Sequence, residues 1–175
     1  MELPKSLEPQ LAAAKVLVVD DQAHMRKLIC TMLKGAGIHF IQEAENGLEA
    51  LNCLAEARPD VVLLDWEMPM IDGLEFIRLV RSSEQNIADI PIIMLTAHGE
   101  RSRVIEAARL GVHEYLVKPV SPKSLAERIT AVLLNPRAMR KVEGRLTPGK
   151  AVENTEPPQT NVTSTKEQSD GTLYI

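Results

Sequence analysis

Residues 16–21, VLVVDD, form a short apolar run that ends in two acidic side chains. A second run of the same kind, VVLLD, spans residues 61–65 and ends in Asp65. Short, fully apolar runs are typical of buried strands in a parallel sheet. If both runs are such strands, Asp20, Asp21 and Asp65 converge at one sheet edge, where their mutual repulsion calls for a cation. We therefore expect a divalent metal site there.

Apolar segments of four to six residues alternate along the chain with amphipathic segments of ten or more. This alternation predicts repeated βα units and an α/β fold around a parallel sheet. Strands are expected near residues 15–20, 38–43, 60–65, 91–96 and 113–118, and helices near 22–35, 47–57, 73–83, 99–110 and 121–134. Right-handed crossovers would place helices on both faces of the sheet.

The composition limits the classes of protein to consider. A chain of 175 residues with 45% hydrophobic content can bury the core of one domain. The net charge of -4 gives no electrostatic reason to expect direct nucleic-acid binding. No apolar stretch approaches the length that spans a bilayer, so we expect a cytoplasmic protein without membrane insertion. Cys30 and Cys53 lack metal-ligand spacing and are expected to be reduced thiols.

The domain boundaries follow from changes in composition. Residues 1–14 are expected to be an N-terminal extension, and residues 15–135 the folded domain. Basic residues are frequent over 137–150, and the following segment is rich in Thr, Glu, Gln, Ser and Pro. Such a composition buries too little apolar surface to offset its ordering entropy. We expect residues 136–175 to be a mostly flexible C-terminal tail.

Two further predicted strands end in reactive groups, Thr96 and Lys118. In an open parallel sheet, these groups would lie on the same rim as the acidic residues. Hard oxygen ligands suit Mg²⁺, and zinc is not expected without His or Cys ligands. A carboxylate beside Mg²⁺ and a lysine can attack a phosphoryl group, because both cations stabilise charge on the phosphoryl oxygens. Asp65 is the candidate nucleophile, with Thr96 and Lys118 as hydrogen-bond donors to the phosphoryl group.

Four motifs, VLVVDD, LLDWEMPMIDG, IIMLTA and YLVKP, occur in this order along the chain. Over residues 15–135 the chain resembles the receiver domain of bacterial two-component response regulators. The resemblance implies a flavodoxin-like five-stranded parallel sheet of order 2-1-3-4-5 with five helices. It implies a phosphorylation-dependent signalling switch in which Asp65 accepts phosphate from a histidine kinase or histidine phosphotransfer protein. Without an output domain after residue 136, the chain is similar to stand-alone, chemotaxis-regulator-like receivers that act on a downstream protein target.

The resemblance also assigns the metal ligands. It implies Mg²⁺ bound by Asp21, Asp65 and the backbone carbonyl of Glu67, with waters held partly by Asp20. Glu67 and His98 fall at variable positions of the family, and we expect them to influence the lifetime of the phosphoryl group by acting on attacking water.

For the conformational switch, the resemblance points to Thr96 as the switch hydroxyl and Tyr115 as the switch aromatic. Lys118 matches the family's phosphate-contacting lysine, and the Lys118–Pro119 bond is expected to be cis. Phosphorylation would bias two pre-existing conformations of helix 4, strand 5 and helix 5, about residues 99–134.

Two other hypotheses compete with the receiver. Aspartate-nucleophile phosphatases of the haloacid dehalogenase class also use a Mg²⁺-bound aspartate, and Glu67 supplies the acid that they require two residues later. The acidic pair before the first predicted helix and the lack of a cap insertion favour the receiver. A degenerate receiver acting as a constitutive interaction module is disfavoured by the complete set of acid, Thr and Lys residues. We therefore expect no enzymatic activity apart from catalysis of the chain's own phosphorylation and dephosphorylation.

Overall fold

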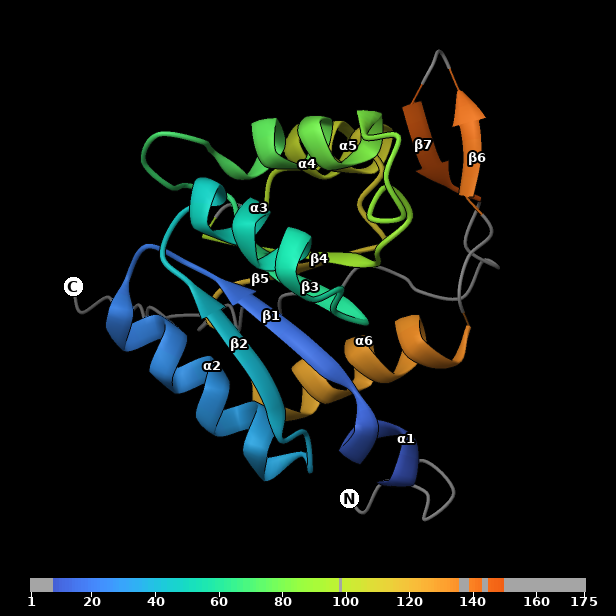
Figure 1. Cartoon of the computed structure of the whole chain (residues 1–175). Coiled ribbons are helices and arrows are strands. Elements are labelled where there is room, and N and C mark those ends of the chain that lie inside the picture. The colour runs from blue at the N-terminus through green and yellow to red at the C-terminus, as the bar shows by residue number, and fades with distance from the viewer. Residues whose placement is uncertain (1–7, 98, 136–138, 143–144, 150–175) are drawn as a thin grey trace, which may run out of the picture.

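A computed structural model describes residues 8–97, 99–135, 139–142 and 145–149 (Figure 1). Its central element is a five-stranded parallel sheet of order β2-β1-β3-β4-β5, which confirms the predicted fold class and strand order. The strands are β1 Lys15–Val19, β2 Phe40–Ala44, β3 Val61–Asp65, β4 Ile92–Thr96 and β5 Glu114–Val117.

Helices cover both faces of this sheet (Figure 1). They are α1 Glu8–Ala13, α2 Ala23–Gly35, α3 Gly47–Glu56, α4 Gly73–Ser82, α5 Arg101–Leu110 and α6 Pro122–Leu134. Side chains of β1 alternate between the two faces, as the geometry of a strand requires. Leu17 packs into the core beneath α3, α4 and α5, and Val18 into the core beneath α2 and α6. None of the described helices is long and apolar enough to cross a membrane.

The register of the strands brings their carboxyl ends together. Val19 lies opposite Leu64, so Asp20 follows β1 at the level where Asp65 ends β3. Asp65 in turn lies opposite Leu95, one residue before the end of β4. The acidic residues and Thr96 therefore share one edge of the sheet, as predicted.

Local side-chain hydrogen bonds start three of the helices soon after the strands. Asn46 accepts from the backbone N–H of Glu49 at α3, and Asp72 accepts from that of Glu75 at α4. A capping box formed with Ser121 starts α6. Such caps satisfy backbone donors that the first turn leaves without partners. Helices α2 and α5, with Gln22 and Glu100 at their N-cap positions, begin without a side-chain cap.

The second strand begins two residues later than the sequence predicts. Gly37 has φ 86, and the N–H of Ile38 donates to the carbonyl of Leu33 at 3.0 Å. This is the left-handed turn that commonly closes a helix, with a buried apolar residue following it. The apolar Ile38 therefore belongs to the end of α2 and not to β2.

Part of the predicted C-terminal tail forms regular structure. Strands β6 Met139–Val142 and β7 Arg145–Pro148 form an antiparallel hairpin, and β7 contacts α4 and α5 (Figure 1). An isolated two-stranded hairpin is marginal in water, so this support is long-range and does not show in the local composition. The predicted tail thus contains a hairpin, its flexibility stays a prediction, and residues 150–175 fall outside the described residues.

Truncation after Asn135 tests whether the hairpin is an accessory to the domain. We expect the five-stranded domain to remain folded, because α6 and its buried residues precede this position. We also expect amide hydrogen exchange in α4 and α5 to become faster, since β7 no longer covers them. Exchange mass spectrometry of the full-length and truncated chains measures both effects. Loss of cooperative unfolding would show instead that the hairpin is an essential part of the domain.

Candidate functional site

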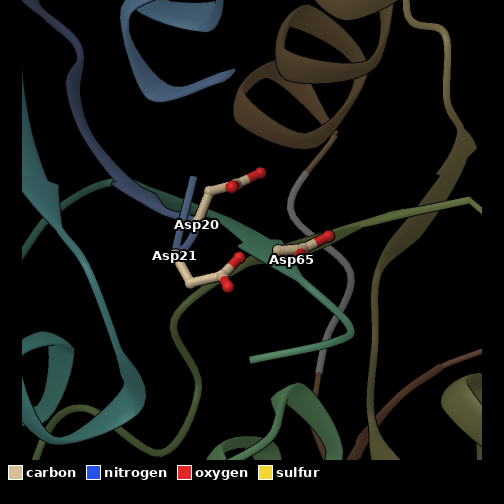
Figure 2. Close-up of side chains that lie close together, drawn as sticks. All are labelled: Asp20, Asp21 and Asp65. Atoms are coloured by element: carbon tan, nitrogen blue, oxygen red, sulfur yellow. The ribbon is translucent and has the colours of Figure 1, made fainter. Parts of the chain in front are cut away.

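Three carboxylates gather at the carboxyl ends of β1 and β3 (Figure 2). One oxygen from each of Asp20, Asp21 and Asp65 lies within 4.8 Å of the others. Asp20 is fully buried and Asp65 is 4% exposed, whereas Asp21 is open to solvent. Concentrated hard oxygen ligands with one open side fit Mg²⁺, which keeps several waters when bound by proteins.

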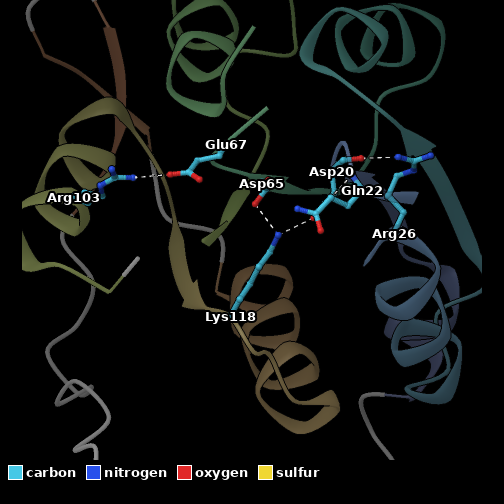
Figure 3. Close-up of polar contacts among 7 residues, drawn as sticks. All are labelled: Asp20, Gln22, Arg26, Asp65, Glu67, Arg103 and Lys118. Atoms are coloured by element: carbon cyan, nitrogen blue, oxygen red, sulfur yellow. Dashed lines mark hydrogen bonds and ion pairs between the residues drawn. The ribbon is translucent and has the colours of Figure 1, made fainter. Parts of the chain in front are cut away.

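Lys118 provides the positive charge opposite this acidic cluster (Figure 3). Its ammonium lies 2.8 Å from an oxygen of Asp20 and 2.8 Å from an oxygen of Asp65. The residue follows β5, and the Lys118–Pro119 bond is cis, as expected. The site thus combines three carboxylates with one amine, which leaves an excess of negative charge for a cation.

The burial of the site changes the proton affinities of both partners. Burial raises the pKa of the Asp65 carboxyl above its ordinary value, although the hydrogen bond and charge of Lys118 act in the opposite direction. Burial alone would lower the pKa of Lys118, but its hydrogen bonds to Asp20 and Asp65 raise it overall. The ammonium is therefore held in its charged form beside the nucleophile candidate.

Thr96 and Tyr115 lie on neighbouring strands. Thr96 is fully buried at the end of β4, and its side chain is hydrogen-bonded to that of Tyr115 in β5. Burial raises the pKa of the Tyr115 hydroxyl, and this hydrogen bond partly offsets the effect. The two residues predicted to form the switch are therefore in contact in this structure.

The loop after β3 folds back tightly on the strand. The N–H of Gly73 donates to the carbonyl of Trp66 at 2.9 Å, and a Cβ at Gly73 would lie 2.5 Å from the carbonyl oxygen of Asp65. Only glycine permits this close approach. Glu67 lies in the loop with its carboxylate directed to Arg103 on α5, whereas His98 falls outside the described residues (Figure 3).

Sequence reasoning missed two arginines next to the site. Arg26 donates to the backbone carbonyl of Asp20 at 2.7 Å, and its Nε lies 3.5 Å from the carboxylate of Glu43. Arg103 contacts Glu67 and the ring of Trp66. The only signal for Arg26 was its position one turn into the helix that follows Asp20, and nothing local indicated Arg103.

With this geometry in hand, comparison with known proteins defines the class of the chain. Residues 16–130 match the family model described as the response regulator receiver domain, and the chain belongs to that family. It is a receiver domain of two-component response regulators, which act in phosphorylation-dependent signalling. Receiver domains signal through partners and bind Mg²⁺ at an acidic pocket, the kind of cluster described above.

Individual relatives point to two kinds of regulator. The chain is 42% identical to chemotaxis protein CheY1 of Helicobacter pylori over 120 residues, which cover 68% of this chain and 96% of the relative. It is 41% identical to the phosphate regulon transcriptional regulatory protein PhoB of Klebsiella pneumoniae over 132 residues, 74% of this chain. The chain spans only 57% of that PhoB relative, so the match does not extend over the whole regulator.

Solved structures agree with the observed fold. Chemotaxis protein CheY4 of Vibrio cholerae matches with a TM-score of 0.63 and 36% identity, over 68% of this chain and 98% of that structure. The receiver domain of the Francisella response regulator 1452 matches with the same TM-score and 30% identity, over 69% of this chain and 97% of that structure. Family membership favours the receiver over the aspartate phosphatase that the sequence left open.

Proposed function

We propose that Asp65 is the phosphoacceptor of this receiver domain. The observation that carries the proposal is the position of the Lys118 ammonium, 2.8 Å from the Asp65 carboxylate within a cluster of three acids. The donor is a phosphohistidine on a histidine kinase or a histidine phosphotransfer protein. An oxygen of Asp65 forms a bond to phosphorus, the P–N bond of the phosphohistidine breaks, and the imidazole nitrogen leaves with the electron pair and takes a proton from solvent.

Different side chains would bind the metal and the phosphoryl group during this transfer. Asp21 and Asp65 would ligate Mg²⁺ directly together with the backbone carbonyl of Glu67, while Asp20 would hold metal-bound waters. The metal supplies charge stabilisation for the phosphoryl oxygens. Lys118 offers a charge-assisted hydrogen bond to one phosphoryl oxygen, and Thr96 offers its hydroxyl to another. The same groups would serve when water attacks the acyl phosphate, so the domain would catalyse both its own phosphorylation and its own dephosphorylation.

Output would follow from the contact between Thr96 and Tyr115. A phosphoryl group adds up to two negative charges and strong acceptors at the rim, so the Thr96 hydroxyl gains a new partner in competition with Tyr115. Tyr115 then becomes free to change rotamer, which biases the face formed by α5, β5 and α6 between two conformations. A downstream protein target would read this face, without direct nucleic-acid contact by the domain.

Metal binding is tested by the fluorescence of Trp66, the single tryptophan of the sequence and the neighbour of Asp65. Mg²⁺ titration should change the emission saturably in the wild type. Asp21→Ala removes a proposed ligand and should weaken the apparent affinity by about tenfold or more, the usual range for perturbing a metal ligand shell. Asp89→Ala is the matched control, because Asp89 pairs with Arg58 before β4, at the other end of the strand. An unchanged titration in Asp21→Ala would reject this set of ligands.

A further inference from the structure

Arg103, in the first turn of α5, contacts the two residues that follow Asp65, and Figure 3 shows its ion pair with the second of them, Glu67. Its Nη1 lies 3.4 Å from Oε1 of Glu67. Its guanidinium carbon lies 5.2 Å from the centroid of the Trp66 ring. One side chain of α5 thus makes an ion pair and a cation–π contact with the segment that follows the nucleophile candidate.

Trp66 connects this contact to the switch residues. The ring is 7% exposed and meets Tyr115 edge to face, with centroids 6.3 Å apart and ring planes at 80°. The backbone N–H of Trp66 donates to the carbonyl of Leu95 at 3.0 Å, which fixes the residue against β4. Trp66 therefore contacts both Arg103 and Tyr115 while its backbone N–H is bonded to β4.

The first turn of α5 lacks a side-chain cap and carries positive charge. Helices α3, α4 and α6 each begin with a side-chain cap, whereas α2 and α5 do not. Arg101 and Arg103 also place positive charge at the amino end of the helix, where the helix dipole disfavours it. Contacts with Trp66 and Glu67 offset this disadvantage and attach the first turn of α5 to the loop after β3.

We propose that Arg103 is a positioning residue for phosphorylation, which holds Glu67 and Trp66 in place beside Asp65 and so couples the start of α5 to the reaction site. The inference rests on the proposed role of Asp65. The guanidinium neutralises the Glu67 carboxylate and keeps it directed toward α5. Without Arg103, the loop after Asp65 loses one positive charge beside the Glu67 carboxylate, and the more negative site disfavours an anionic phosphodonor.

The effect should be moderate, because both partners are partly exposed. Exposed ion pairs and cation–π contacts each correspond to roughly two- to fivefold in an equilibrium or rate. We therefore expect Arg103→Gln to slow Mg²⁺-dependent phosphorylation by acetyl phosphate about three- to fivefold. Arg101→Gln is the matched control, because it removes the same charge from the same helical turn at an exposed position. It should change the rate less than twofold, as expected for a screened surface charge.

Trp66 emission separates a positioning role from a general effect of charge. Arg103→Gln should shift the emission of the metal-free protein, because the ring loses its guanidinium neighbour, and Arg101→Gln should not. Arg103→Lys should restore most of the phosphorylation rate but not the emission, since an ammonium pairs with Glu67 without stacking on the ring. Thermal unfolding checks that each variant is folded, and Arg103→Lys serves as the test if Arg103→Gln is not.

A double-mutant cycle shows whether Arg103 acts through Glu67. In a Glu67→Gln background, Arg103→Gln should slow phosphorylation no more than Arg101→Gln does. The proposal would be overturned if Arg103→Gln slowed phosphorylation in the Glu67→Gln background as much as it does in the wild type. It would also be overturned if Arg103→Gln and Arg101→Gln, each made in the wild type, had equal phosphorylation rates and equal Trp66 emission. Absence of labelling in the wild type would instead refute the role of Asp65, while the emission measurements would still decide whether Arg103 holds Trp66.

Discussion

Asp65→Asn should abolish the Mg²⁺-dependent labelling of the protein by acetyl phosphate. The amide has nearly the shape of the carboxylate but lacks the anionic oxygen that attacks phosphorus. Intact-mass spectrometry should find one added phosphoryl group on the wild type and none on the variant. Asp60→Asn is a suitable control, since Asp60 sits at the amino end of β3, where it accepts from the N–H of Lys15. Labelling of Asp65→Asn at the wild-type rate would contradict the assignment.

The same variant should change the pH dependence of stability. Burial raises the pKa of the Asp65 carboxyl above its ordinary value. At a pH between these two values, the carboxyl is protonated in the folded protein but ionised in the unfolded chain. The free energy of unfolding contributed by this group therefore falls as pH rises through that window. In metal-free buffer near neutral pH, Asp65→Asn should unfold at a higher denaturant concentration than the wild type. The difference should disappear in acid, where the wild-type carboxyl is protonated, and a less stable variant at neutral pH would contradict the prediction.

Arg81→Lys should lower the free energy of unfolding by about 3 kcal/mol. The compact ammonium of lysine cannot make the several hydrogen bonds that the buried guanidinium of arginine makes. Arg81 is 2% exposed and lies in α4. Its Nε and Nη2 donate to the carbonyl of Gly111 at 3.0 and 2.9 Å, and its Nη1 donates to that of Ala88 at 2.8 Å. Gly111 caps the carboxyl end of α5, where the helix dipole favours a positive charge.

Burial lowers the pKa of Arg81 to about 10, so the guanidinium remains charged at neutral pH. A lysine would leave one charge in the same buried place and could not serve both carbonyls. Arg78→Lys is the matched control on the same helix, because Arg78 is exposed and lies 3.9 Å from Glu106. Urea unfolding measures the free energy of unfolding of both variants. For the control Arg78→Lys, this free energy should change by less than about 0.5 kcal/mol. Equal, small changes in both would show that the Arg81 contacts contribute little.

The sequence predicted the sheet and its acidic edge because their causes are local. Each strand is a continuous apolar run, and Asp20, Asp65, Thr96 and Lys118 each stand at or just after a strand end. Parallel pairing then brings these positions together without further information. The roles assigned through the resemblance, above all the metal ligands and the switch, remain predictions, and the Trp66 titration tests the metal ligands.

The features that the sequence did not reveal depend on contacts between distant segments. Nothing in the sequence around Arg81 and Arg103 indicates their contacts, because their partners lie in other segments of the chain. Ile38 is apolar enough for a strand, but Gly37 closes the helix before it. The hairpin likewise contacts helices that are distant in the sequence. The nearer of them, α5, ends at Leu110, whereas the hairpin starts at Met139.

Chemical trapping tests the central claim most directly, because it needs no substitution. Borohydride reduces the acyl phosphate of a phosphorylated aspartate to homoserine, which peptide mass spectrometry can locate. After incubation with acetyl phosphate and Mg²⁺, we predict homoserine at position 65 and unmodified Asp20 and Asp21. Homoserine at either of those two positions, or a phosphoryl group that resists reduction on another residue while Asp65 stays intact, would contradict the account.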